Sequence, residues 1–203
     1  IGIGKNGPTH QPVEILASMR AMPNLRVLRP CDAVETAEAW EIAIDRKAGP
    51  TALIFARQSG PTLRREGGPE NKSARGGYVL AQAEGGARRV TLLSTGTEVA
   101  LAMAARDMLQ AQGVPTAVVS MPSWDLFEAQ PRSYRDETLG PGTMRVAVEA
   151  AVRMGWDRWI GERGAFIGMS GFGASGPADQ LYERFGITAH AVAKAALDGL
   201  AAK

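Results

Sequence analysis

Hydrophobic and polar positions along residues 1–58 change their period several times, and each change predicts a different element. Residues 13–20 place their apolar side chains on one side, which predicts a short amphipathic helix. Residues 25–28 are a short apolar run of strand length, and residues 51–56 are a second, continuous one. A continuous apolar run of this length is typical of a parallel strand that is covered on both faces.

A longer helix is expected between these two strands. Asp32, followed three residues later by Glu35, is an aspartate version of the capping box and predicts the start of the helix. Gly49 and Pro50 end it. Four apolar residues recur at helical spacing and predict a helix over residues 33–47 with one buried stripe. These residues are Ala33, Ala37, Trp40 and Ile44.

Residues 59–77 have no periodicity and are rich in Gly, Pro and charged side chains. Loops this long without structure are uncommon inside a compact domain, so the segment is interpreted as an inter-domain linker. We therefore expect one domain over residues 1–58 and a second over residues 78–203.

The second domain again alternates apolar runs with helical periodicity. This alternation, with short connections, predicts a mostly parallel α/β sheet with right-handed crossovers. The expected strands are 90–93, 116–120, 145–148 and 166–169, and the expected helices are 97–112 (ending at Gly113), one starting at 125–127, 178–185 (ending at Gly186) and one following Thr188.

Composition narrows the possible function classes. Hydrophobic residues make up 45% and charged residues 22% of the 203 residues, which is typical of a globular protein. A net charge of +2 is too small to indicate nucleic acid or a membrane surface as the main partner. A single cysteine, Cys31, excludes a disulfide framework, fits the cytoplasm and is interpreted as a small apolar filler. The chain starts at Ile1 without a signal peptide, and we expect it to begin inside a larger protein.

His10 is the first candidate for chemistry. It lies between Pro8 and Pro12 and after Gly7, where the prolines restrict the backbone. With Pro12 in the first turn of a helix, the imidazole would lie at a helix N-terminus and could exchange hydrogen bonds near neutral pH. The alternative interpretation is that His10 only ties down its own loop.

Arg57 is the second candidate, because it follows the apolar run 51–56 directly. Ligands of open α/β sheets bind outside the carboxyl ends of strands, and a guanidinium there can hold a phosphate in a bidentate manner. A surface ion pair is the alternative. His190 lies in the last helix without a partner motif and is interpreted as structural or solvent-facing. The sequence contains neither a dinucleotide fingerprint nor residues with metal-ligand spacing.

Six stretches together resemble the transketolase family. Three are similar to the end of its pyrimidine-binding domain and three to its C-terminal domain, in the family's order and over nearly the whole chain. The resemblance therefore implies the last third of a transketolase: a truncated pyrimidine-binding domain of the thiamine diphosphate fold over residues 1–58, a linker and a transketolase C-terminal-like domain over residues 78–203. The stretches are Gly7-Pro-Thr-His-Gln-Pro-Val-Glu14, Leu28-Arg-Pro-Cys-Asp32, Arg57-Gln58, Ser120-Met-Pro-Ser-Trp-Asp-Leu-Phe127, Gly171-Phe-Gly-Ala-Ser-Gly-Pro-Ala178 and Leu181-Tyr-Glu-Arg-Phe-Gly-Ile-Thr188.

The resemblance implies a transferase that moves a two-carbon ketol unit from a ketose phosphate to an aldose phosphate, using thiamine diphosphate and Mg²⁺ or another divalent cation. His10 matches the family's catalytic histidine at the reacting end of the sugar, and Arg57 matches the arginine that binds the substrate phosphate. Asn6, after Lys5, takes the place of an aspartate that contacts the donor, so it can hydrogen-bond there without charge. Residues 59–61 read Ser-Gly-Pro where the family often has Asn-Leu-Pro.

The resemblance also implies what this chain lacks. The residues that bind the cofactor and the metal lie upstream in the family, so none is expected here and the isolated chain is expected to be inactive. The expected partners are sugar phosphates, the upstream region of the same protein and, at full length, a second copy. The setting implied is carbohydrate metabolism, in the pentose phosphate pathway or the Calvin cycle.

Two alternatives stay open. Dihydroxyacetone synthase and deoxyxylulose-phosphate synthase resemble transketolase in architecture, and either type would use a different substrate pair. A second possibility is a non-catalytic association or regulatory module, because the C-terminal domain has no catalytic constellation of its own.

Overall fold

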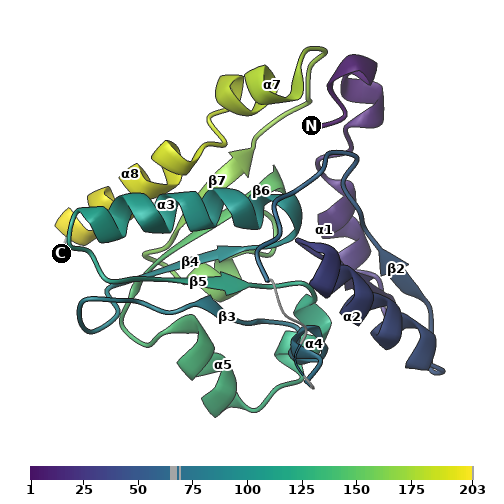
Figure 1. The fold of residues 1–203 in the computed structure, drawn as a ribbon. Coiled ribbons are helices and arrows are strands. Elements are labelled where there is room, and N and C mark those ends of the chain that lie inside the picture. Colours follow the sequence, from purple (N-terminus) through teal and green to yellow (C-terminus); the bar gives the residue numbers. More distant parts are fainter. Residues whose placement is uncertain (65–67, 69, 203) are drawn as a thin grey trace.

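Two sheets of different size organise the chain (Figure 1). The smaller pairs β1 (Arg26–Leu28) in parallel with β2 (Thr51–Leu53), and α1 (Ile15–Arg20) and α2 (Ala33–Asp45) pack with it. We call residues 1–58, with the smaller sheet, the first unit, and residues 78–202, with the larger sheet, the second or C-terminal unit. The structure is a computed structural model that describes residues 1–64, 68 and 70–202.

The larger sheet has five strands in the order β3-β5-β4-β6-β7. Its strands pair in parallel except β3, which lies antiparallel to β5 at one edge, so the predicted mostly parallel α/β class is confirmed. The elements of this unit are β3 (Tyr78–Ala81), β4 (Val90–Ser94), α3 (Val99–Ala111), β5 (Thr116–Ser120), α4 (Trp124–Glu128), α5 (Arg132–Leu139), β6 (Met144–Val152), α6 (Asp157–Ile160), β7 (Ala165–Met169), α7 (Ala178–Arg184) and α8 (Ala189–Ala201). Short 3₁₀ helices are η1 (Gly4–Asn6), η2 (Pro8–His10), η3 (Lys72–Arg75) and η4 (Gly96–Glu98).

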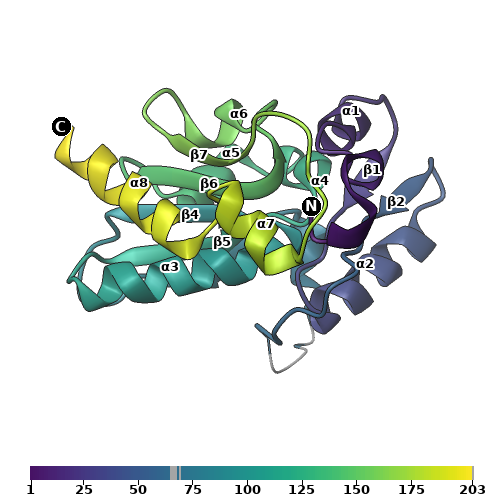
Figure 2. The ribbon, with the colours of Figure 1, turned by 90° about the horizontal axis from the view of Figure 1, so that it is seen from above.

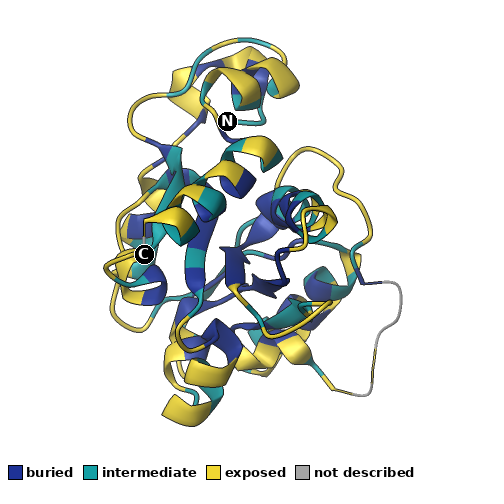
Figure 3. Cartoon of the chain, turned by 90° about the vertical axis from the view of Figure 1, so that its left-hand side faces the viewer, coloured by how far each residue is buried: buried dark blue, intermediate teal, exposed yellow. Residues whose placement is uncertain are grey.

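Helices cover both faces of the larger sheet. Successive strand residues point to opposite faces, so Leu92 packs in the cluster formed with α3 and α8, whereas Leu93 packs in the cluster formed with α4 and α6. Figures 1 and 2 show α3 and α8 side by side on one face. Burial follows this layering, because the central strands are buried and the outer sides of the helices are exposed (Figure 3).

Three tryptophans form the centre of the second cluster. The ring of Trp124 meets those of Trp156 and Trp159 edge-on, at centroid distances of 4.9 Å and 6.1 Å. Edge-to-face contacts of this kind add to the stabilisation from burial. All three side chains are buried.

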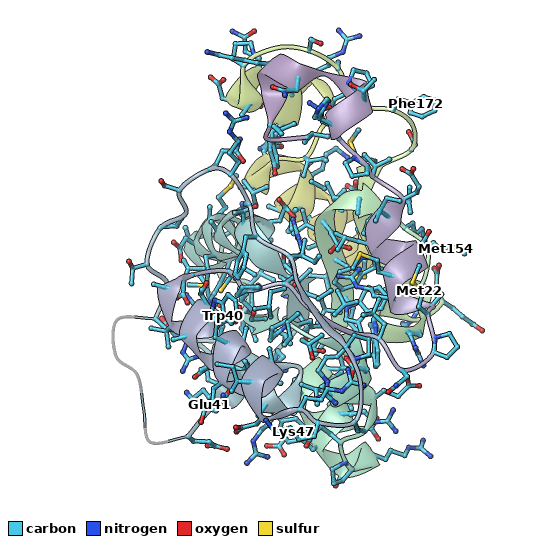
Figure 4. The ribbon with its side chains drawn as sticks, turned by 90° about the vertical axis from the view of Figure 1, so that its right-hand side faces the viewer. Met22, Trp40, Glu41, Lys47, Met154 and Phe172 are labelled. Atoms are coloured by element: carbon cyan, nitrogen blue, oxygen red, sulfur yellow. The ribbon has the colours of Figure 1, made fainter. Side chains whose placement is uncertain are left out.

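The predicted buried stripe of α2 is wrong. Trp40 and Ile44 are 51% and 63% exposed, and Figure 4 shows Trp40 on the outer side of the helix. The buried side carries Glu35 and Glu38 instead, because residues distant in the sequence supply hydrogen-bond partners for both carboxyl groups. The start of the helix is as predicted, since Asp32 Oδ1 accepts a hydrogen bond from the Glu35 amide at 2.9 Å.

Several boundaries also differ from the prediction. The second strand ends at Leu53 rather than at residue 56, and it is half-buried because its sheet has only two strands. The sequence pattern missed β3, α5 and α6.

Part of the predicted linker 59–77 packs against the first unit. Arg64 is buried, and its two terminal nitrogens donate hydrogen bonds of 2.8 Å to the two carboxylate oxygens of Glu38. Residues 65–67 and 69 of the same segment lie outside the described part. The domain boundaries remain a prediction.

Candidate functional site

A cavity of about 330 Å³ opens beyond the carboxyl ends of β1 and β2. This edge of a parallel sheet is where α/β proteins bind ligands, and the volume suits a small molecule. Both units line the cavity, which makes it a site between them. Its walls comprise residues 1–3, 10–13, 15, 16, 19, 29, 30 and 54–58 from the first unit, and Gly96, Thr97, Ala150 and Tyr182 from the second.

His10 lines this cavity at the end of a tight turn. Gly7 has φ +69°, a conformation that side chains rarely adopt, and its carbonyl accepts a hydrogen bond from the His10 amide at 3.1 Å. The imidazole is exposed, and its Nδ1 lies 2.9 Å from the hydroxyl of Thr9. The first α-helix begins only at Ile15, so the expectation that Pro12 opens it is wrong by most of a turn.

Arg57 lines the same cavity from the segment that follows β2. Among residues 1–64, 68 and 70–202, no carboxylate lies within ion-pair distance of its guanidinium. The next residue, Gln58, packs against the backbone of Gly2, where an added Cβ would lie 2.3 Å from the Gln58 Oε1. This contact joins the segment after β2 to the start of the chain.

Asn6, the third predicted site residue, does not line the cavity. It is exposed at the end of η1, and its carbonyl accepts a hydrogen bond of 3.4 Å from the hydroxyl of Thr9. The structure therefore brings His10 and Arg57 to one cavity, whereas Asn6 is exposed and not part of its lining. His190 is exposed on α8, as interpreted, and takes no part in the cavity.

Arg29 is a cavity residue that the sequence did not single out. Its Nη1 lies 2.6 Å from Glu98 Oε2, and the hydroxyl of Tyr182 donates to Glu98 Oε1 at 2.7 Å. Burial alone would raise the pKa of Glu98, but Arg29 and these hydrogen bonds hold it below its ordinary value. Burial likewise acts to lower the pKa of Arg29, and Glu98 and Glu149 raise it above its ordinary value.

Glu149 extends this network to α1. It accepts hydrogen bonds from Arg20 at 2.9 Å and 2.8 Å and from the indole of Trp156 at 2.8 Å. The arginines belong to the first unit and the carboxylates to the second, so a buried network of four charges joins the two units beside the cavity. No local sequence signal could have paired them, because Arg20 and Glu149 are 129 residues apart.

Metal-ligating side chains do not gather at any point in the described part of the chain. Residues 1–64, 68 and 70–202 contain no group of three or more His, Cys, Asp or Glu side chains that could hold a metal ion. None of the described helices is both long enough and apolar enough to cross a membrane.

Two family models match the chain. The transketolase pyrimidine-binding domain matches residues 1–62, and the transketolase-like TK C-terminal domain matches residues 76–188. Curated relatives include a transketolase of Sinorhizobium medicae, 57% identical over 197 residues (96% of this chain and 28% of the relative), and one of Geobacillus stearothermophilus, 47% identical over 190 residues (93% and 28%). The chain therefore spans 28% of the length of either relative.

Solved structures agree with the family models. A transketolase of Pichia stipitis in complex with sedoheptulose 7-phosphate has a TM-score of 0.90 at 37% identity, over 98% of this chain and 29% of that one. A split-gene transketolase, described as an inactive β4 tetramer, has a TM-score of 0.79 at 26% identity, over 96% of this chain and 63% of that one.

Proposed function

We propose that this chain, which belongs to the transketolase family, supplies the part of a sugar phosphate site that holds the two ends of the substrate. The observation that carries the proposal is that His10 and Arg57, 47 positions apart in the sequence numbering, line one cavity at the carboxyl ends of β1 and β2. The completed protein then transfers a two-carbon ketol unit from a ketose phosphate to an aldose phosphate.

The two side chains suit different ends of such a substrate. The imidazole of His10 can donate or accept a hydrogen bond and move a proton at the carbonyl and hydroxyl oxygens of the reacting end. The guanidinium of Arg57 can hold the phosphate with two parallel hydrogen bonds, and this distant binding energy orients the reacting carbons. Asn6, exposed in the same turn although it does not line the cavity, is our candidate for an uncharged hydrogen bond to the donor.

Transketolases depend on thiamine diphosphate, which supplies the electron sink for the reaction when it is bound. We propose that the cofactor and a divalent cation such as Mg²⁺ bind mainly residues outside this chain. For the cation, this is supported by the lack of any group of three or more metal-ligating side chains among the described residues. The isolated chain is then inactive, and the description of the split-gene relative as an inactive tetramer supports this.

Two further proposals concern assembly and location. We propose that the completed protein forms a homodimer, and the exposed Trp40 and Ile44 on α2 support the presence of a contact surface. The single cysteine, buried and unpaired, supports a cytoplasmic location.

A chimaera tests the proposal. In it, this chain replaces the matching segment of the Sinorhizobium medicae transketolase, and the isolated chain is assayed beside it. Ketol transfer from xylulose 5-phosphate to ribose 5-phosphate is expected from the chimaera only. His10→Ala should lower kcat by about 10²- to 10⁴-fold, the usual contribution of a group that transfers protons. Arg57→Ala should lower kcat/KM for phosphorylated sugars by about 10- to 100-fold, and much less for an unphosphorylated ketose.

Matched controls are available on the surface. His190→Ala on α8 and Arg132→Ala on α5, both exposed, should leave the kinetics unchanged. Activity with formaldehyde in place of ribose 5-phosphate, or with pyruvate plus glyceraldehyde 3-phosphate in place of both sugar phosphates, would instead favour the other thiamine-dependent enzymes. Unchanged kinetics in both His10→Ala and Arg57→Ala would favour an association or regulatory module and contradict the proposed site.

A further inference from the structure

The turn that carries His10 is held by one loop of the C-terminal unit. We call residues 4–11 the histidine turn and residues 173–176 the glycine loop. Gly176 donates its amide to the carbonyl of Gly4 at 3.3 Å, and the side chain of Gln11 exchanges two hydrogen bonds with the backbone of Ala174. Among the described residues beyond position 12, no others hydrogen-bond to the histidine turn. Figures 1 and 2 show the chain before α7 beside the start of the chain.

Gln11 makes the strongest of these attachments. Its amide oxygen accepts from the Ala174 amide at 3.0 Å, and its nitrogen donates to the carbonyls of Ala174 at 3.0 Å and of Ile1 at 3.2 Å. The residue is 3% exposed, so little water can replace these bonds. A buried amide that loses such partners leaves several polar groups unsatisfied.

The glycine loop approaches the turn too closely for larger residues. A Cβ on Gly173 would lie 1.7 Å from Gln11 Oε1, and a Cβ on Gly7 would lie 2.4 Å from the hydroxyl oxygen of Ser175. The absence of side chains at these two positions therefore lets Gln11 pack against the backbone of Gly173, and Ser175 against the backbone of Gly7. Phe172, 81% exposed, lies just before the loop and points away from the body of the molecule (Figure 4).

His10 itself has no comparable anchor. The polar partner of its ring is the adjacent Thr9, so the direction of the imidazole depends on the backbone of the turn. Gln11 is the next residue and fixes that backbone to the second unit. We propose that Gln11, through Ala174 of the glycine loop, is the positioning residue for His10, and that this is how the C-terminal unit contributes to the reaction. The inference rests on the proposed function.

The test uses Gln11→Met in the chimaera. Methionine keeps the length and packing of the side chain but removes its hydrogen bonds to Ala174. A misplacement of a catalytic group by about 1 Å can cost about 10²-fold, so we expect kcat to fall by about 10- to 100-fold, with KM changed by less than about threefold. In a His10→Ala background the same substitution should change kcat by less than about twofold, because a positioning residue acts only through the group it positions.

Gln110→Met is the matched control. Gln110 on α3 also bridges backbone with both amide atoms, accepting from Thr116 at 2.6 Å and donating to Glu84 at 3.1 Å. It lies in the last turn of the helix, whereas the cavity residue Thr97 precedes the first turn, about 20 Å away at 1.5 Å per residue. The Gln110→Met substitution should lower the unfolding midpoint and leave kcat unchanged.

The outcomes separate this inference from the proposed function. If His10→Ala lowers kcat as expected but Gln11→Met retains wild-type kcat, Gln11 does not position His10 and only this inference fails. If Gln11→Met lowers kcat by the same factor with and without His10, the role of Gln11 is structural and the inference also fails. If His10→Ala has no effect on kcat, the proposed function fails, and this inference fails with it.

Discussion

Replacing Glu149 by glutamine tests the charge network that joins the two units. Glutamine keeps the shape of the side chain but removes the negative charge and one of its acceptor oxygens. The carboxylate now accepts two hydrogen bonds from Arg20 and one from the indole of Trp156. A single amide oxygen cannot satisfy all of them, so Arg20 loses its carboxylate partner, whereas Arg29 keeps Glu98.

The magnitude follows from the burial of these groups. The side chains of Glu149 and Arg20 are 0% and 9% exposed, so solvent can do little to screen the unpaired charge. Removing one partner of a buried ion pair costs about 3–5 kcal/mol. At about 2–4 °C for each kcal/mol in a chain of this size, the unfolding midpoint should fall by about 6–20 °C.

Urea unfolding at pH 7, followed by circular dichroism, measures the loss of unfolding free energy, and thermal unfolding measures the fall of the midpoint. The matched control is Glu128→Gln, whose ion pair with Arg158 is exposed and should contribute less than about 1 kcal/mol. Adding Arg20→Met to Glu149→Gln should restore most of the lost stability, since it removes the uncompensated cation. A loss below about 1 kcal/mol for Glu149→Gln alone, or a double variant no more stable than the single one, would refute this account of the network.

Two further predictions concern α2 and its start. Glu35 accepts hydrogen bonds from Tyr78 and Ser120 but has no cationic partner among the described residues, and burial raises its pKa above the ordinary 4.5. The native state therefore binds this proton more tightly than the unfolded chain, and the contribution of Glu35 to stability declines as pH rises from 4.5 through its raised pKa. The unfolding free energy of Glu35→Gln minus that of the wild type should accordingly grow with pH between about 4 and 8, and a constant difference would contradict this. Burial also raises the pKa of the Cys31 thiol, so an aromatic disulfide reagent should label the native chain slowly and the urea-unfolded chain rapidly; rapid native labelling would show that the thiol is accessible.

Periodicity and local signals predicted much of the fold. The Asp32 cap of α2, the buried strand β5 and the helix that ends before Gly113 are local features, and each lies as expected. The buried side of α2 was not predictable in this way. Hydrophobic periodicity assumes that carboxylates face water, and Glu38 instead faces Arg64, which lies 26 residues away.

The candidate site shows the same division between local and distant information. His10 and Arg57 are recognisable because each lies next to a local signal, a proline-bounded turn or the end of an apolar run. Gln11 was part of the same motif, but its importance depends on Ala174, 163 residues away. Sequence spacing cannot reveal a contact that only the folded chain creates.

The outward-facing Trp40 gives this protein a built-in optical probe. The other three indoles, of Trp124, Trp156 and Trp159, are buried, with exposures of 7%, 0% and 3%. A polar quencher such as acrylamide should therefore quench the fluorescence of Trp40 and leave that of the other three nearly unchanged. A partner that binds on α2 would shield the Trp40 indole from the quencher and shift its emission spectrum to the blue. Association at this helix can thus be followed in solution without a label.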